Sequence, residues 1–151
     1  MTAKEYLNQA FVIERQIRLT LEKAERMRDC LEYRSPSFEG TGSGGGSHDR
    51  IGSSVAKIAD YERQADELVD RLIDKRLEIE NTVKAVCNPV QREILERRYL
   101  LYQPWESRFD ERSGKYVRGI ADEMGYSRRR IFQLHGEALK KIAPDCIELH
   151  L

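Results

Sequence analysis

The sequence has few of the residues that build metal centres, disulfide frameworks and membrane spans. Its 151 residues include three cysteines, three histidines, four prolines and one tryptophan. Cys30, Cys87 and Cys146 lie far apart, without the paired spacing that zinc needs, and we expect them to be reduced. No apolar run approaches the roughly 20 residues of a membrane span, and the N-terminus lacks a charged-then-apolar signal pattern. These absences predict a cytoplasmic protein.

No catalytic constellation is visible either. Cysteine and histidine are too scattered to form a nucleophile–base pair. The Gly-rich stretch 40–46 lacks the Gly-Lys-Ser or Gly-Lys-Thr ending and the flanking strand of a phosphate-binding loop, and His48 beside it has no metal-ligand partner. We therefore predict no enzyme, no catalytic residue, no cofactor and no metal.

What the chain has in abundance is charge. Charged residues make up 34% of the sequence and hydrophobic residues 40%, a balance that suits long exposed helices. The formal net charge is zero, but residues 88–143 hold 12 basic and 8 acidic residues, whereas residues 1–87 hold 14 and 16. The positive excess therefore lies in the C-terminal part, which points towards a phosphate-binding end there.

Two amphipathic segments of similar length occupy the first 87 residues. The first begins with a capping box at Thr2 and Glu5 and is expected to form one helix to about residue 34. The second is expected over residues 54–87, and a flexible Gly-rich linker over 35–54 joins them. Both carry heptad-like apolar stripes: Tyr6, Ala10, Ile13, Ile17, Thr20, Ala24, Met27 and Leu31, then Val55, Ile58, Ala65, Val69, Leu72, Ile79, Val83 and Val86. The pattern predicts an antiparallel, coiled-coil-like hairpin that a second copy completes.

Acidic residues crowd the second segment and raise the alternative of a carboxylate metal site. No histidine lies among them to complete the ligand pattern of helix bundles, and basic residues interleave with them. A solvated helix face with weak ion pairs is the better interpretation. The acids are Asp60, Glu62, Asp66, Glu67, Asp70, Asp74, Glu78 and Glu80.

Residues 88–118 predict a helix and an insertion. Asn88 is a good N-cap, Pro89 suits the first helical position, and Gln91 is placed to complete a capping box. Residues 102–118 suit either a small β-hairpin around the turn 110–114 or a disordered surface loop, with Trp105 partly buried. As a hairpin, the insertion would present a basic wing made of Arg108, Arg112, Lys115 and Arg118.

Residues 119–142 are typical of a helix-turn-helix. Apolar residues at helical spacing stop at Gly125, which readily takes the left-handed conformation that ends a helix, and Ser127 can cap the next one. One apolar stripe follows: Ile131, Leu134, Ala138, Leu139 and Ile142. The other face is expected outward: Arg128, Arg129, Phe132, Gln133 and His135. A tight helical corner with a solvated basic face is the alternative. Beyond Pro144, the tail 144–151 alternates like an edge strand or an apolar tail that docks on a partner.

The run Ser127-Arg-Arg-Arg-Ile-Phe-Gln-Leu-His135 resembles the recognition helix of region four of bacterial primary sigma factors, and residues 120–127 resemble the helix and turn before it. Residues 91–100 resemble the opening helix of the same fold. The resemblance covers about the last third of the chain. It implies a helix in the major groove of DNA, with Arg128, Arg129 and Gln133 at bases and Arg130 and Lys141 opposite phosphates.

Arginine can bond guanine bidentately and glutamine adenine, so these residue types suit base reading. Arg129 stands where the family usually has an acid, and Phe132 where it usually has a basic residue, so a different hexamer is expected. The predicted DNA-binding residues are Ser127, Arg128, Arg129, Arg130, Phe132, Gln133, His135 and Lys141.

The whole chain also resembles a family of small proteins from phages and prophages of Gram-positive bacteria, related to late-gene activators of the RinA and ArpU type. The matching stretches are residues 1–7, 83–89, 124–127 and 134–140. The resemblance implies a phage-encoded regulator that binds double-stranded DNA. The helical patterns predict an all-α fold, and the apolar stripes predict a homodimer or larger assembly. Bacterial RNA polymerase is a further expected partner. Its expected parts are a self-associating hairpin (1–87), a helix-turn-helix domain (88–143) and a tail (144–151). A DNA-packaging component resembling a terminase small subunit, or a protein-interaction component, is the alternative.

Overall fold

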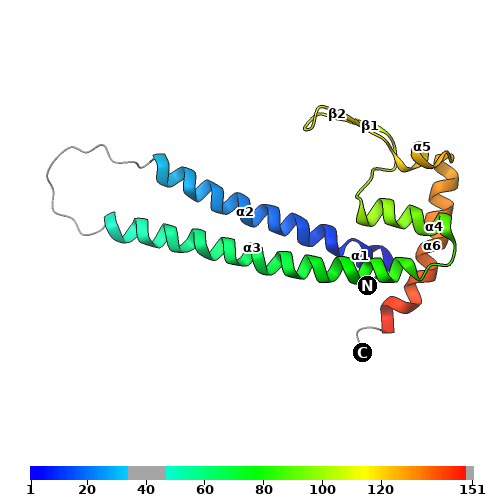
Figure 1. Ribbon diagram of the computed structural model, residues 1–151, viewed down its shortest axis with the longest axis horizontal. Helices are drawn as coiled ribbons and strands as arrows, with labels where there is room; N and C mark the ends of the chain where they lie inside the picture. The colour runs from blue at the N-terminus through cyan, green and yellow to red at the C-terminus, as the bar shows by residue number, and fades with distance from the viewer. Residues whose placement is uncertain (34–46, 149–151) are drawn as a thin grey trace. The chain divides into compact units, whose positions relative to one another are not determined.

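The computed structural model describes residues 1–33 and 47–148. The described residues are mostly helical and include one small antiparallel sheet, which confirms the all-α class (Figure 1). The chain divides into two units. We call Val12–Ile73 the two-helix unit, and Met1–Phe11 together with Asp74–Leu151 the terminal unit.

The N-terminal segment forms two helices where one was predicted. The Thr2 hydroxyl accepts from the Glu5 amide at 3.2 Å and the Glu5 carboxylate accepts from the Thr2 amide at 2.7 Å, so the capping box is confirmed. Helix α1 (Ala3–Leu7) ends at Asn8, and α2 (Gln9–Tyr33) follows directly. Asparagine competes with helical hydrogen bonding through its own side chain, which favours such an interruption.

Helix α3 (Ser47–Lys84) begins earlier than predicted. The predicted linker is therefore wrong over residues 47–54, and its part 35–46 lies outside the described residues. The early start is compatible with the local sequence, because residues 47–54 contain a single glycine and no proline. Within this part of the helix the Ser54 hydroxyl donates to the Arg50 carbonyl at 2.9 Å.

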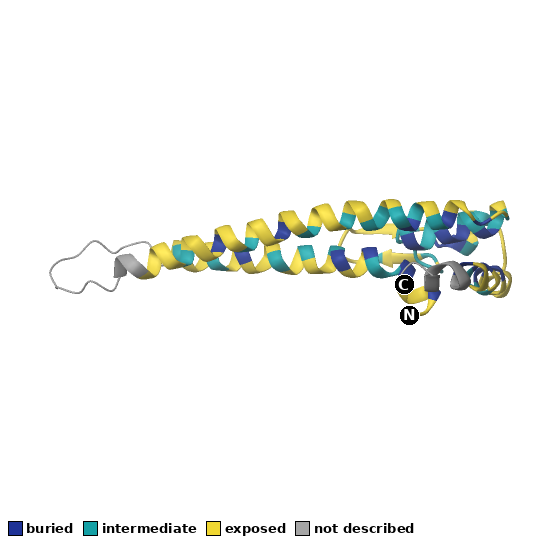
Figure 2. Ribbon diagram, turned by 90° about the horizontal axis from the view of Figure 1, so that it is seen from below, coloured by how far each residue is buried: buried dark blue, intermediate teal, exposed yellow. Residues whose placement is uncertain are grey.

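The two-helix unit pairs α2 with α3 in opposite directions. Arg28 forms an ion pair with Glu62, and one cleft is lined by Leu31 and Ser54 together. Much of the surface of these helices is exposed (Figure 2). Within this unit the buried apolar residues are Ile13, Ala24, Ile58 and Ala65.

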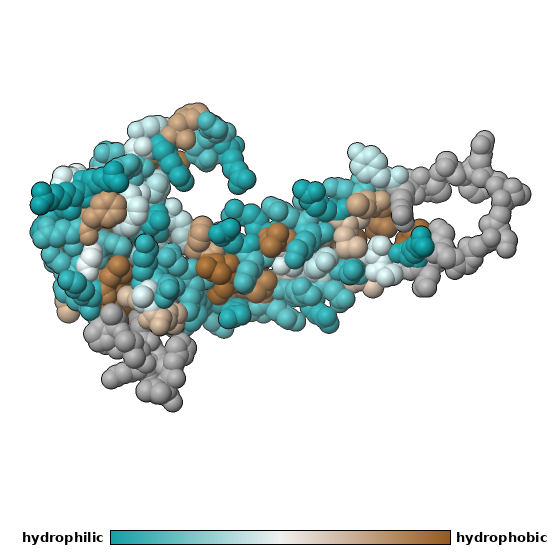
Figure 3. Space-filling view, turned by 180° about the vertical axis from the view of Figure 1, so that it is seen from behind, coloured by the Kyte–Doolittle hydropathy of each residue, from teal (hydrophilic) through white to brown (hydrophobic). Residues whose placement is uncertain are grey.

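Several apolar residues of the two-helix unit face outward. Val55 and Val69, which the heptad-like pattern places in the apolar stripe, are 53% and 39% exposed in the single chain. Figure 3 shows apolar side chains at the surface of the paired helices. The large exposed apolar residues described in this unit are Val12, Leu19, Leu21, Tyr33, Ile51, Val55, Val69 and Ile73.

The terminal unit has a core of large apolar residues. Helix α4 (Pro89–Leu95) continues into the π-helical turn η1 (Glu96–Leu100), and α5 (Ile120–Met124) and α6 (Arg128–Glu148) follow the insertion. The Asn88 side chain caps α4 by accepting from the amides of Val90 and Gln91, as predicted. The core contains Ile94, Ile120, Ile131 and Leu134, with Trp105 packed partly buried against it. Helix α6 also packs on α4 and α1.

The insertion contains the predicted β-hairpin. Strands β1 (Arg108–Asp110) and β2 (Lys115–Val117) are antiparallel, with Phe109 opposite Tyr116. The turn between them places Gly114 at φ +63° and lets the Asp110 carboxylate accept from the Ser113 hydroxyl at 2.7 Å. The hairpin alternative is therefore confirmed over the disordered loop.

The C-terminal tail differs from the prediction over its first half. Helix α6 continues through Pro144 to Glu148, so residues 144–148 are helical and do not form an edge strand. A proline inside a helix removes one backbone donor without obliging the helix to stop at that residue. Residues 149–151 lie outside the described residues.

Candidate nucleic-acid interface

The start of α6 presents the basic face that the sequence predicted. Gly125 has φ +69° and ends α5, and its amide bonds to the Ala121 carbonyl. The Ser127 hydroxyl then accepts from the Arg130 amide at 3.3 Å as the cap of α6. All three arginines 128–130 are exposed, and so are Phe132 and Gln133. The glycine turn thus leaves the first turns of α6 open to a ligand.

His135 does not belong to this face. Its side chain is 8% exposed, and its Nε2 lies 2.9 Å from the Tyr99 hydroxyl. The ring also lies 4.8 Å from Trp105 and 5.9 Å from Tyr99, measured between centroids. The predicted outward position of His135 is therefore wrong, because the side chain turns inward towards aromatic partners from η1 and the insertion.

Burial is the main influence on the protonation states of His135 and Tyr99. Burial, together with the positive charges of Lys4 and Arg98, lowers the pKa of His135 to about 4. Burial likewise raises the pKa of the Tyr99 phenol, against the opposing charge of Arg98. Both rings are neutral at pH 7, so His135 supplies no charge to a phosphate.

Lys141 and Gln91 fasten α4 to α6. The Lys141 ammonium donates to the Gln91 side-chain oxygen at 2.7 Å, and the Gln91 amide nitrogen donates to Glu137 at 3.0 Å. Gln91 is buried, and its side chain points to α6 where a capping contact within α4 was predicted. The ammonium of Lys141, expected opposite a phosphate, thus has a contact inside the unit.

Aromatic and cationic side chains alternate beside the start of α6. The Arg128 guanidinium lies 5.5 Å from the centroid of Phe132, and Phe132 lies 5.0 Å from Trp105. The guanidinium of Arg98 lies 5.0 Å from the same Trp105 ring. An open cleft of about 550 Å³ adjoins these groups, and Phe11 is also in its wall. Such a stack gives long side chains few alternative rotamers.

Two acids already contact the predicted base-reading residues. The Arg128 guanidinium pairs with the Glu106 carboxylate at 2.5 Å. The Gln133 amide nitrogen donates to the Glu137 carboxylate at 3.2 Å, four residues later on α6. Glu106 was not predicted as a site residue, and no local pattern reveals it, because 22 positions separate it from Arg128 in the sequence.

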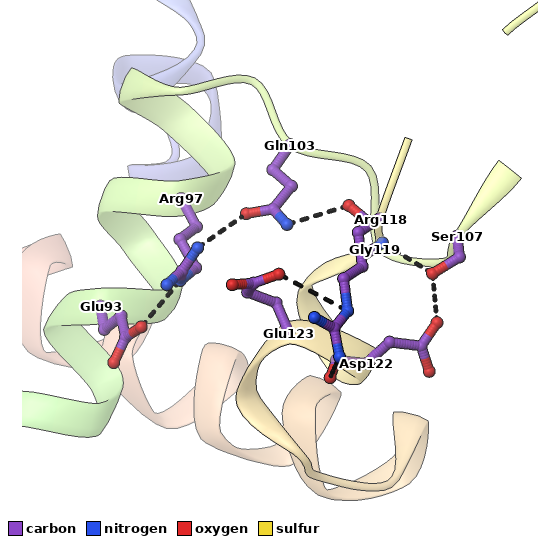
Figure 4. A network of polar contacts seen from close by, with 8 residues as sticks. All are labelled: Glu93, Arg97, Gln103, Ser107, Arg118, Gly119, Asp122 and Glu123. Carbon is purple, nitrogen blue, oxygen red and sulfur yellow. Dashed lines mark hydrogen bonds and ion pairs between the residues drawn. The ribbon is translucent and has the colours of Figure 1, made fainter. Parts of the chain in front are cut away.

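A polar network closes the base of the insertion (Figure 4). The Gln103 side chain donates to the Arg118 carbonyl at 2.9 Å and accepts from Arg97 at 3.2 Å. The Ser107 hydroxyl accepts from the Gly119 amide at 2.8 Å and donates to the Asp122 carboxylate. Both ends of the insertion are therefore tied together and attached to η1 and α5.

The β-hairpin displays the predicted wing residues on its surface. Arg108, Arg112, Lys115 and Arg118 are all exposed. Arg118 also forms an ion pair with Glu123 at 3.6 Å, so part of its charge is compensated locally. The cross-strand pair Phe109 and Tyr116 is 61% and 69% exposed, an unusual exposure for aromatic rings. The hairpin can therefore offer charge and ring faces to the same ligand.

Comparisons of the chain with protein-family models, curated proteins and solved structures find no match. Among the described residues, no group of three or more histidine, cysteine, aspartate or glutamate side chains is arranged to hold a metal ion. None of the described helices combines the length and apolar character that crossing a membrane requires. The function is therefore inferred from α6 and its surroundings.

Proposed function

We propose that this protein is a sequence-specific regulator that binds double-stranded DNA through a helix-turn-helix made of α5, the Gly125 turn and α6. The observation that carries the proposal is the exposed start of α6, where Arg128, Arg129 and Gln133 follow a capped turn. Residues near the start of a recognition helix are the ones that reach base edges in the major groove. The opposite stripe of α6 is buried in the core, so this face is the one left for a ligand.

In the proposed mechanism, phosphate contacts hold the protein on the DNA, and base contacts then recognise the sequence. Arg130 and the exposed cations of the β-hairpin attract phosphates without regard to sequence. Arg128 and Arg129 then donate to guanine, and Gln133 exchanges hydrogen bonds with adenine. Ser127 supports the cap of the helix, and Phe132 supplies an apolar contact of the kind that meets a thymine methyl. Lys141 and His135 act inside the unit, through Gln91 and Tyr99.

Self-association is the second part of the proposal. The two-helix unit would act as an antiparallel hairpin whose exposed apolar residues meet those of a second copy. Two recognition helices related by symmetry would then read an inverted repeat. Phage transcription is the setting that the motif resemblance favours, with RNA polymerase as a further partner of the assembled regulator.

The decisive experiment is selection of bound fragments from random and phage DNA at physiological salt. An enriched inverted repeat supports the proposal. Arg128→Ala and Gln133→Ala should each then lose about 1–3 kcal/mol of discrimination at one base pair. Arg71→Ala, an exposed arginine of the two-helix unit, is the matched control and should bind normally. A folded chain that enriches no sequence would instead favour DNA packaging or a protein partner.

Light scattering at micromolar concentration tests the self-association. We expect a dimer or larger assembly that Leu19→Lys combined with Val69→Lys dissociates, because both exposed apolar side chains would then carry charge. Gln64→Lys, at an exposed polar position of α3, should leave the assembly intact. A wild-type monomer would contradict this part of the proposal.

A further inference from the structure

Two side chains contact the Arg128 guanidinium: Glu106 from the insertion and Phe132 one turn later on α6. The Glu106 carboxylate pairs with one terminal nitrogen at 2.5 Å, and the Phe132 ring lies under the guanidinium at 5.5 Å. Both acid and arginine keep more than half of their side-chain area exposed, at 59% and 67%. Pairs this exposed contribute little to folding stability. The two contacts place the Arg128 guanidinium between Glu106 and Phe132.

The backbone that carries Glu106 is fixed on α5. The Pro104 carbonyl accepts from the Ile120 amide at 2.9 Å, and the Trp105 carbonyl accepts from the Ala121 amide at 3.4 Å. Gly119 is in such close contact with residues 106 and 107 that a Cβ there would collide with their backbone. Because α5 packs on α6, the backbone of Glu106 is placed near the start of α6, where its carboxylate reaches Arg128.

We propose that Glu106 is a specificity-determining residue that aims Arg128 at guanine and away from phosphate. A guanidinium carries five N–H donors in a planar fork, so one nitrogen can bond Glu106 while the others bond the O6 and N7 acceptors of a guanine. The pair has no net charge, so it attracts phosphate far less than an unpaired arginine does. An anionic phosphate oxygen placed at the same fork would also meet the nearby carboxylate.

This inference rests on the proposed function and predicts two opposite effects of one substitution. Glu106→Gln keeps the shape of the side chain but removes its charge. Non-specific affinity should rise, since one more cation faces phosphate. Discrimination at the base pair read by Arg128 should fall about tenfold, because the arginine loses its fixed orientation. A residue that merely supported the fold would weaken both kinds of binding.

The test uses the full chain and three acid variants. Binding to the selected site, to the same site with the contacted guanine replaced, and to a random duplex is measured over a salt series. Glu111→Gln is the matched control, because Glu111 is an exposed acid in the turn of the same insertion and its loss changes net charge equally. It should leave discrimination unchanged. Glu106→Asp keeps the charge but withdraws the carboxylate, and should lower discrimination without strengthening non-specific binding.

Two results overturn the inference separately from the proposed function. If the wild-type chain is selective and Glu106→Gln matches Glu111→Gln in discrimination, Glu106 acts through net charge alone. If Glu106→Gln lowers discrimination equally in an Arg128→Ala background, the effect does not pass through Arg128. A wild-type chain that selects no sequence overturns the proposed function, and this inference with it.

Discussion

The two units use hydrophobic residues in different ways. The terminal unit buries large side chains completely, among them Leu7, Ile94, Leu95, Ile120 and Ile131. The two-helix unit has few buried apolar residues, two of them alanines, and leaves eight large apolar residues of its described part exposed. Burial of apolar area is the dominant favourable term in folding, so this term contributes more in the terminal unit than in the two-helix unit. The two-helix unit instead leaves many of its large apolar side chains exposed at its surface.

This difference in burial matches the different roles proposed for the two units. The base reading proposed for α6 needs a rigid support, and α6 has a core shared with α4 and α5. An oligomerisation element needs apolar area that is left uncovered until a partner arrives. The following substitutions test whether the two units differ in how their packing stabilises them. They are taken from the largest expected change in stability to the smallest.

The strongest test compares the same substitution in the two units. Ile94→Ala removes a side chain that is fully buried in the terminal core and should cost about 2–5 kcal/mol. Ile58→Ala, at 7% exposure in the two-helix unit, should cost less, because a thin helix pair can close around the lost volume. Urea unfolding followed by circular dichroism, and by fluorescence of the single tryptophan, Trp105, measures both. Equal losses of stability from the two substitutions would contradict the proposed difference in packing between the units.

The second test uses pH, because the buried histidine belongs to the terminal unit alone. The pKa of His135 is about 4 when folded, against about 6.5 when unfolded. The unfolded chain therefore binds more protons between these values, and stability falls as the pH drops from 6.5 towards 4. The loss attributable to His135 should approach roughly 3 kcal/mol at the lower pH.

His135→Gln isolates this contribution from the carboxylates that titrate in the same range. Unfolding midpoints of the wild type and the variant, measured at pH 7 and pH 4.5, should converge at the lower pH. Parallel curves would mean that the histidine is protonated in the folded state and is not sheltered as its contacts indicate.

The third test compares two glycines of the terminal unit. Gly119→Ala places a methyl group against the backbone of Glu106 and Ser107 and should cost about 1–3 kcal/mol. Gly136→Ala, inside α6 with no atom within 4 Å of the new methyl, should instead stabilise the helix by roughly 0.5–1 kcal/mol. Opposite signs in thermal unfolding are the expected result. A neutral Gly119→Ala would show that the insertion yields easily, and would weaken the case for a fixed Glu106.

Local signals in the sequence sufficed for much of the terminal unit. The capping box at Thr2, the Asn88 cap, the Gly125 turn and the Ser127 cap depend on contacts within a few residues, and all are present. The β-hairpin was predicted on the same basis.

Long-range contacts explain what the sequence prediction missed. His135 lies four residues after Ile131 and three before Ala138, so helical spacing already placed it beside the buried stripe, but its polarity suggested the outer face. Its partner Tyr99 is 36 positions away. Likewise, nothing near Arg128 in the sequence identifies Glu106, which is brought close by the insertion.

The smallest expected change in stability comes from a substitution in the two-helix unit. It tests directly whether the two units unfold independently. Gly52→Ala adds a methyl group to α3 where no atom beyond its own helix backbone and chain neighbours lies within 4 Å, so any gain must come from helix propensity. We expect about 0.5–1 kcal/mol of added stability, seen in the dichroism of the helices. Trp105 fluorescence should barely change, because that ring reports on the terminal unit. A matching rise in both signals would mean that the units unfold as one, and that the two-helix unit depends on shared cooperativity more than on a second copy.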